Sequence, residues 1–333
     1  MKTLTVEKPS NFQSITWDTA SDNCVAMIED LLSKEIADIQ GVIREICRYT
    51  LNAGGKRVRP LLVWYSGLLF GRESEDLKRT AVAAELIHMA SLIHDDIIDG
   101  SEFRHNRPTA QIIWGNHQAV LGGDCLFAKA FGILAKNTFS EPLAIMVEAI
   151  QNMCQGEITQ DKEQFNSMIG IEDYYDRISK KTAALIKASC MAGAVVSGAD
   201  NSQIEAIGRF GLNLGLAFQI IDDILDLCGD ERKMGKPKYT DLIKGNLTLP
   251  VLLLMKEPQY QVWLRDILKK QGIDKPILTE IERVVKESGV MELAFTLGVS
   301  HLDEARNILK DFAENPAQQF LENFTYILQA RAN

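Results

Sequence analysis

The sequence lacks the cysteine spacing that marks a zinc site or a disulfide framework. Its 333 residues include six cysteines, with no C-x-x-C pair and no close spacing. Such cysteines are typical of reduced, buried thiols, so we expect a cytoplasmic protein. The opening segment, MKTLTVEKPSNFQS, has no apolar core of the kind that a signal peptide carries. No stretch approaches the roughly 20 apolar residues of a membrane-spanning helix.

The chain is also short of positive charge. Lysine and arginine total 36 against 45 aspartates and glutamates, which gives a formal net charge of −9. General nucleic-acid binding needs a basic face, so this balance argues against a nucleic-acid partner. Any anionic ligand must therefore be held by local basic residues or by a metal ion.

Signals for β-strands are scarce as well. The nine prolines are scattered singly, and no hairpin dipeptide separates alternating apolar runs. Helical patterns cover 20–52, 74–98, 109–137, 141–161 and 172–197, and further helices are expected to about residue 330. No Ser/Pro/Gly-rich linker and no repeat divides the chain. We therefore expect a variable N-terminal segment over 1–19 and a single all-α domain over 20–333.

The segment SQIEAIGRFGLNLGLAFQIIDDILDLCG, which starts at residue 202, predicts one long helix. Ser202 and Glu205 form a capping box at its start, and Gly229 supplies a stop at its end. Three glycines fall at helical spacing within it: Gly208, Gly211 and Gly215. Each costs roughly 1 kcal/mol relative to alanine, so close approach of a neighbouring helix is the expected compensation. The polar stretch after this helix, 229–249, is a candidate lid because it is long and irregular.

Two apolar segments each carry three aspartates at the same spacing. HDDIID (94–99) contains Asp95, Asp96 and Asp99, and IDDILD (221–226) contains Asp222, Asp223 and Asp226. Residues four apart share one helix face, so the outer aspartates of each triplet project together. Clustered carboxylates repel one another unless cations compensate. Mg²⁺ suits such a site because it prefers a few carboxylates, several waters and phosphate oxygens. One triplet alone is typical of a solvated helix face, but two behind apolar runs indicate a shared metal site.

Basic residues at three places provide partners for a phosphate ligand. GGKRVRP (54–60) sets Lys56, Arg57 and Arg59 at a Gly-Gly turn before a helix, a plausible anion cradle. FRHNRPT (103–109) adds Arg104 and Arg107, and KKTAAL (180–185) adds Lys180, Lys181 and Thr182. Each of these alone is more simply read as a solvated surface charge. Their arrangement around the triplets favours a phosphate site.

With these motifs the chain resembles the trans-isoprenyl diphosphate synthases of the polyprenyl synthetase family. The resemblance covers about 50–255 and rests on GGKRVRP, HDDIID, RHNRPT, CQGEITQ, KKTAAL, FQIIDDILD and GKPKYTDLIKGNLTLP, in this order. It implies a bundle of roughly ten or more helices around a deep central cavity, as a homodimer or, alternatively, a heteromer with a small subunit. It also implies head-to-tail condensation of isopentenyl diphosphate onto an allylic diphosphate, with Mg²⁺ or alternatively Mn²⁺.

The resemblance assigns roles to individual side chains. The implied metal ligands are Asp95, Asp99, Asp222 and Asp226, with Asp96 and Asp223 in support. The implied contacts to the allylic diphosphate are Arg104, Lys181, Thr182, Gln219 and Lys236. The implied contacts to isopentenyl diphosphate are Lys56, Arg59, His88 and His105. The triplets and Lys181 would stabilise the departing diphosphate and so carry the catalysis.

Three positions depart from the family pattern. His105 stands where the family has the second arginine of an Arg-Arg pair, which weakens one contact to isopentenyl diphosphate or makes it pH-dependent. Tyr239 replaces the usual glycine of GKPxGxD, which would stiffen the lid. Asn246 replaces a lysine common in short-chain members, as in longer-chain relatives.

Residues just before Asp95 on its helix face bear on product length. Ala90 and Ser91 lie one turn back and Ile87 a further turn back. In this family a bulky aromatic one turn before the triplet stops the growing chain. The small residues here predict a tunnel. One helical turn of about 5.4 Å matches an isoprene unit, so we expect a product of roughly C30 or longer, delivered to a membrane. The alternative is a floor set elsewhere and a farnesyl or geranylgeranyl product.

Three other interpretations fit part of the pattern. A class I terpene cyclase also uses D-D-x-x-D with Mg²⁺, but it normally lacks a second triplet and has no use for GGKRVRP. A di-iron protein would use ELIH (85–88) and EFRH (102–105), but the second lies in a proline-containing loop and no further Glu pair is evident. The chain could also be the catalytic subunit of a heteromeric synthase that is inactive alone.

Overall fold

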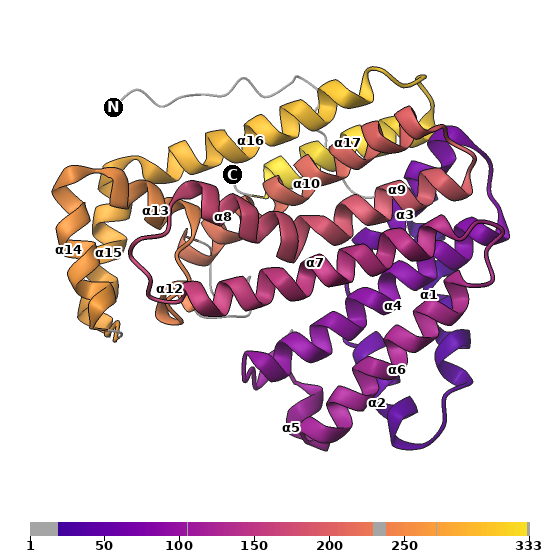
Figure 1. Ribbon diagram of the computed structural model, residues 1–333, viewed down its shortest axis with the longest axis horizontal. Coiled ribbons are helices and arrows are strands. Elements are labelled where there is room, and N and C mark those ends of the chain that lie inside the picture. The colour runs from indigo at the N-terminus through magenta and orange to yellow at the C-terminus, as the bar shows by residue number, and fades with distance from the viewer. Residues whose placement is uncertain (1–18, 105, 229–237, 271, 332–333) are drawn as a thin grey trace.

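The computed structural model describes residues 19–104, 106–228, 238–270 and 272–331. Long helices lie side by side across the molecule, and shorter ones gather at one end (Figure 1). The helices of the first half are α1 (Thr19–Ala37), α2 (Gly41–Leu51), α3 (Val58–Phe70), α4 (Glu75–Ile98), α5 (Ala110–Trp114), α6 (Asn116–Leu134) and α7 (Glu141–Glu163). Those that follow are α8 (Ile171–Ile178), η1 (Ser179–Ala183), α9 (Ala184–Val196), α10 (Asn201–Cys228), α12 (Thr240–Ile243), α13 (Leu249–Lys256), α14 (Pro258–Lys269), α15 (Lys275–Ser288), α16 (Val290–Leu309) and α17 (Pro316–Ala330). The predicted all-α class is confirmed.

Helix α4 carries the first aspartate triplet into the middle of the bundle. It begins where predicted, because the Ser74 side chain accepts a hydrogen bond from the Leu77 backbone N–H at 3.1 Å. Its central residues are buried on all faces, and it packs on α3, α6 and α9. A helix that is apolar all round belongs in a core. The triplet therefore sits at the end of a buried helix, and Asp99 is its C-cap residue.

Helix α10 carries the second triplet and starts one residue earlier than predicted. The capping box is formed by Asp200 and Gln203, which exchange hydrogen bonds of 2.9 and 3.0 Å, and not by Ser202 and Glu205. By length and composition alone α10 could cross a membrane, so the expectation of no such stretch was wrong. It is nevertheless a core helix, since it packs on α9 and α16. The predicted stop, Gly229, lies outside the described residues.

The helix predicted over 172–197 is interrupted by a π-helical turn, η1. Two glycines of neighbouring helices clamp this turn. A Cβ atom on Gly156 of α7 would lie 2.6 Å from the Lys181 backbone nitrogen, and one on Gly215 of α10 would lie 2.5 Å from the Ala183 Cα. The close approach predicted for the α10 glycines is thus confirmed. A π-turn is rare and is found mostly at functional sites, where it re-aims side chains.

Two shorter departures concern loops. The helix predicted over 109–137 is broken into α5 and α6 at Gly115, whose φ of +81° is one that glycine adopts without strain. The segment after the first triplet forms the only strands in the described part of the chain, β1 (Phe103–Arg104) and β2 (Arg107–Pro108), paired antiparallel. Both changes arise from backbone geometry that the apolar pattern does not report.

The apolar interior forms two clusters, and both triplets lie close to where they meet. The larger cluster joins the first helices of the chain to α9, α10 and α17, and the smaller one joins α8, α13, α15 and the end of α10. The candidate lid is only partly described, since 229–237 lie outside the described residues. Its later part holds α12, which begins after Tyr239. That residue is buried with a φ of +60°, in keeping with a position where the family has glycine.

Candidate active site

A cavity of about 160 Å³, here called the acidic cavity, lies where the ends of α4 and α10 meet α12. Carboxylates from three elements form its wall: Asp99 of α4, Asp222 and Asp223 of α10, and Asp241 of α12. The other wall residues are Gln160, Tyr174, Arg177, Ile178, Lys181, Thr182, Gln219, Lys244, Asn246 and Thr248. The two triplets therefore do share a cavity, as their spacing predicted.

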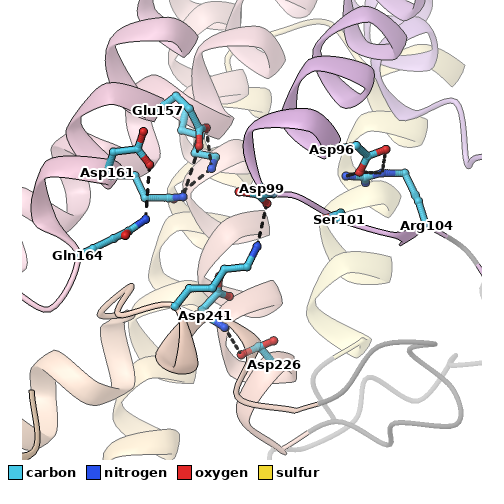
Figure 2. A network of polar contacts seen from close by, with 12 residues as sticks. Asp96, Asp99, Ser101, Arg104, Glu157, Asp161, Gln164, Asp226 and Asp241 are labelled. Carbon is cyan, nitrogen blue, oxygen red and sulfur yellow. Dashed lines mark hydrogen bonds and ion pairs between the residues drawn. The ribbon is translucent and has the colours of Figure 1, made fainter. Parts of the chain in front are cut away.

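Lys181 reaches this cavity from the π-turn. Its Nζ lies 2.7 Å from a carboxylate oxygen of Glu157 and donates to the Gln160 side-chain oxygen at 3.1 Å (Figure 2). Burial, together with the nearby charge of Glu157, raises the pKa of Asp95 to about 6, while Lys181 acts in the opposite direction. The cluster of like charges that the sequence implied is thus partly compensated by this lysine.

The middle aspartate of the second triplet is held by neutral donors. The Tyr174 hydroxyl donates to one oxygen of Asp223 at 2.7 Å, and the Gln219 amide donates to the other at 2.7 Å. The Thr182 hydroxyl in turn donates to the Gln219 oxygen at 2.6 Å. Burial, with the charge of Asp241 adding to it, raises the pKa of Asp223 to about 8. Thr182 and Gln219 are therefore brought together as predicted.

The triplet acids on the cavity wall, Asp99, Asp222 and Asp223, do not form a compact metal cage. Among the described residues, no three His, Cys, Asp or Glu side chains gather closely enough to hold a metal by themselves. Asp99 and Asp222 are on the cavity wall, whereas Asp226 is fully buried and accepts from the Asp241 backbone N–H at 3.4 Å. The carboxylates of this wall offer oxygen ligands, which fit Mg²⁺, since this ion keeps several waters and takes phosphate oxygens from its ligand.

A second pocket, of about 540 Å³ and here called the basic pocket, lies on the other side of the end of α4. Asp96 lines the basic pocket while Asp99 lines the acidic cavity, and Figure 2 shows the two side chains set apart. Its charged and aromatic wall residues are Tyr49, Lys56, Arg57, Arg59, Glu85, His88, Asp96, Arg104, Arg107, Phe218 and Arg331. The sequence-predicted contacts to isopentenyl diphosphate, Lys56, Arg59 and His88, are therefore together.

Arg59 and His88 form the centre of the basic pocket. The Arg59 guanidinium lies 3.0 Å from His88 Nε2, and because arginine only donates, His88 is the acceptor. Burial and the charges of Arg59, Arg104 and Arg57 hold the pKa of His88 well below its usual range, so the ring is neutral. The buried Arg59 Nε has no hydrogen-bond partner within the described residues. A buried donor of this kind is costly unless a ligand or water accepts from it.

Arg57, two residues before, also lines the basic pocket, but its guanidinium is already engaged by groups of the protein. Its guanidinium donates to Glu85 at 2.9 Å and to the Leu51 carbonyl at 3.0 Å, and both charged side chains are almost fully buried. Arg57 therefore stabilises the fold. The same contact makes the di-iron interpretation untenable at ELIH, since Glu85 pairs with Arg57 and His88 with Arg59.

Arg104 lies in the basic pocket and not on the acidic cavity wall. Its Nε and a terminal nitrogen grip Asp96 at 2.9 and 2.8 Å, a two-point ion pair visible at the right of Figure 2. Two other predicted contacts, His105 and Lys236, lie outside the described residues. The chain-length candidates Ile87, Ala90 and Ser91 are buried in the core behind the triplet. Their effect on product length remains a prediction.

Two residues of the two pockets were given no role by the sequence motifs. Arg331, beyond the last motif, lies 5.5 Å over the Phe218 ring, and its charge adds to burial in lowering the pKa of Lys56. Asp241 belongs to the candidate lid but has no regular spacing with either triplet. Only folding brings Arg331 of α17 to the basic pocket, so no local signal could have found it, whereas Asp241 stands within the motif GKPKYTDLIKGNLTLP and could have been singled out there.

Comparisons with known proteins agree with this geometry. The sequence model of the family described as Polyprenyl synthetase matches residues 40–285. The chain is 34% identical over 307 residues to heptaprenyl diphosphate synthase component 2 of Geobacillus stearothermophilus, which covers 92% of this chain and 95% of the relative.

Solved structures are similar over almost the whole chain. Heptaprenyl diphosphate synthase from Staphylococcus aureus superposes with a TM-score of 0.89 at 33% identity, covering 94% of this chain and 99% of that one. Polyprenyl synthase from Caulobacter crescentus CB15, complexed with calcium and isoprenyl diphosphate, gives a TM-score of 0.87 at 31% identity, covering 94% and 96%.

Proposed function

We propose that this protein lengthens an allylic diphosphate with isopentenyl diphosphate to a product of roughly C30 or longer. The chain belongs to the polyprenyl synthetase family and is a prenyl diphosphate synthase. One observation carries the proposal. Acids of both triplets line one cavity, and the end of α4 separates that cavity from a pocket with surplus cations. Two diphosphates can thus be held next to each other, one through metal and one directly.

We propose Mg²⁺ as the metal, with Mn²⁺ as the alternative. Asp99 and Asp222 of the cavity wall would hold it together with Asp95, while Asp223 and Asp226 keep the end of α10 in place. The Caulobacter relative contains calcium with isoprenyl diphosphate, which supports a divalent ion at this kind of site. When bound, the metal offsets the negative charge of the departing diphosphate.

The residues of this chain then divide the reaction between two sites. Lys181, fixed by the clamped π-turn, donates to the allylic diphosphate and stabilises its departure, which leaves an allylic cation. Lys56, Arg59 and neutral His88 hold isopentenyl diphosphate so that its double bond attacks this cation. The proton lost afterwards passes to the released diphosphate. The described end of the candidate lid, which holds α12, and the C-terminal helices keep water from the cation.

The product assay tests this proposal directly. Purified protein is incubated with isopentenyl diphosphate, farnesyl diphosphate and Mg²⁺, and the products are separated by chain length. A polyprenyl diphosphate of about C30 or longer is expected. Hydrocarbon formed from the allylic diphosphate alone would instead identify a terpene cyclase, and no turnover of either kind would contradict the assignment.

Product length has its own test at Ala90, which is fully buried one turn before the first triplet. Replacing Ala90 by phenylalanine places a large ring in the proposed tunnel. We expect the product to become shorter by several isoprene units while turnover of the starter substrate persists. An unchanged product length would place the floor of the tunnel elsewhere.

A second candidate follows from the name of a relative. The Geobacillus protein is a "component 2", which favours a two-component synthase in which this chain is the catalytic part. A homodimer is our first proposal, and a heteromer with a small subunit is the alternative. Activity of the purified single chain, with its mass measured in solution, decides between them.

A further inference from the structure

Lys244 and Asn246 stand on the wall of the acidic cavity, on the loop that follows α12. The Lys244 Nζ lies 3.2 Å from a carboxylate oxygen of Asp99, and this pair is the dashed contact at Asp99 in Figure 2. Lys244 therefore reaches from the second half of the chain to the first triplet. The side chains of Lys244 and Asp99 are each about one third exposed, so solvent and ligands can reach them.

The loop that carries these residues is fixed in place. Gly245 has a φ of +82°, and a Cβ atom there would lie 2.4 Å from the Phe165 ring, so only glycine fits. The Phe165 N–H donates to the Gly245 carbonyl at 2.9 Å, and Arg177 donates to the Leu247 carbonyl at 2.6 Å. Lys244 and Asn246 are thus presented to the cavity by a backbone that ligand binding does not have to order.

Asn246 carries a buried side-chain oxygen that the described residues leave unsatisfied. It is 6% exposed, and its side-chain oxygen has no hydrogen-bond partner among the described residues although it lies on the cavity wall. A buried, unsatisfied amide is costly. Because the amide can turn to present either its oxygen or its NH₂ group, it can serve a phosphate oxygen or a metal-bound water.

The other cations of the cavity wall already have carboxylates of their own. Lys181 is paired with Glu157 at 2.7 Å, and Arg177 is paired with Glu163. Among the described residues, Lys244 is paired with Asp99 alone, which is the carboxylate that the proposed function gives to the metal. When a divalent ion takes Asp99, Lys244 loses this counter-ion, and the diphosphate held by that ion offers it another anion.

We propose that Lys244 and Asn246 are part of the allylic diphosphate site. In the empty cavity Lys244 offsets the charge of Asp99, and in the loaded cavity its ammonium donates to a diphosphate oxygen while Asn246 donates beside it. This inference rests on the proposed function, because it takes the diphosphate to be the ligand of the acidic cavity. The site would then have two cations that contact the diphosphate: Lys244 from the candidate lid and Lys181 from the π-turn.

The experiment is a calorimetric titration of the full chain with inorganic pyrophosphate in the presence of Mg²⁺. We expect Lys244→Gln to weaken binding at the Mg²⁺-dependent site about 10- to 100-fold, as for loss of a charged hydrogen bond, and Asn246→Leu to weaken it about tenfold. Lys244→Arg keeps the charge and should remain within about threefold of the parent. In turnover, KM for farnesyl diphosphate should rise in Lys244→Gln while KM for isopentenyl diphosphate stays the same.

The matched control is Lys269→Gln, which removes the same charge from α14, where Lys269 pairs with Asp266 and is largely exposed. If Lys244→Gln binds pyrophosphate as tightly as Lys269→Gln does, the inference is overturned. The result is separable from the proposed function. A parent chain that binds Mg²⁺ and pyrophosphate but makes no prenyl product refutes the proposed function. The titration would still measure whether Lys244 and Asn246 contribute to pyrophosphate binding.

Discussion

The two pockets on either side of the end of α4 differ in which charge they hold in surplus. In the basic pocket the acids are already matched, Asp96 by Arg104 and Glu85 by Arg57. The cations left without a carboxylate partner among the described residues are Lys56, Arg59, Arg107 and Arg331. In the acidic cavity the four aspartates outnumber the cations, two of which are matched by glutamates outside its wall.

This difference shows how one protein can hold two diphosphates in two ways. A pocket with surplus cations binds a bare diphosphate by direct hydrogen bonds. A cavity with surplus carboxylates repels the same anion until a divalent ion reverses its charge. The middle aspartates express the same contrast: Asp96 is gripped by an arginine, and Asp223 is held by the neutral donors Tyr174 and Gln219.

The largest effect is expected where the acidic surplus is removed. The double variant Asp99→Asn, Asp222→Asn takes one carboxylate from each triplet, so the metal loses ligands on both sides of the cavity. We expect kcat to fall by about 10³-fold or more. Steady-state kinetics measure this.

The control for this variant is the basic pocket. Pyrophosphate should still bind there without metal, and chelation of Mg²⁺ from the parent chain should reduce two pyrophosphate sites to one. A double variant that keeps more than a tenth of the parent's kcat would contradict a metal site shared by the two triplets.

The next largest effect separates two arginines of one motif. Arg57→Met leaves the buried Glu85 carboxylate without its partner, and we expect a loss of about 3–5 kcal/mol in the free energy of unfolding. Arg59→Met removes a group that faces the pocket, so it should cost little stability and should raise KM for isopentenyl diphosphate. Chemical denaturation and kinetics of both variants test this, and equal stabilities would show that Arg57 is not structural.

The same pair shows how far the sequence could be read. Apolar periodicity and capping residues give α4 and most of α10, and the triplets and GGKRVRP identify both pockets because their residues are local in the chain. Within GGKRVRP, however, nothing local distinguishes Arg57 from Arg59, since Glu85 lies one helix away and only packing sets it against Arg57.

The way in which distant segments meet at the two pockets could not be predicted either. Arg331 reaches the basic pocket because α17 packs on α3, and Asp241 reaches the acidic cavity because α12 folds back on the end of α10. The π-turn at Lys181 is equally invisible to a 3.6-residue pattern. It is set by the two glycines that clamp it from α7 and α10.

A smaller effect is expected at the middle aspartate of the second triplet. Tyr174→Phe removes one of the two donors to the buried Asp223, which should cost about 1–2 kcal/mol of stability. Tyr175→Phe, the same change one residue on, is the matched control and should cost under about 0.5 kcal/mol. Urea unfolding of the two variants compares them directly. If both cost the same, Asp223 does not depend on neutral donors, and the contrast with Asp96 fails.

The smallest effect concerns the neutral histidine of the basic pocket. Folding lowers the pKa of His88 well below its ordinary value, so below about pH 6.5 the unfolded chain binds a proton that the folded chain excludes. The folded state is therefore penalised as the pH falls, and His88→Gln removes that penalty. Between pH 7.5 and pH 5.5 the parent should lose about 1 kcal/mol more unfolding free energy than His88→Gln does. Equal losses would mean that His88 is charged at pH 5.5. The surplus cations would then not keep His88 neutral, and the proposed role of these charges in the basic pocket would fail.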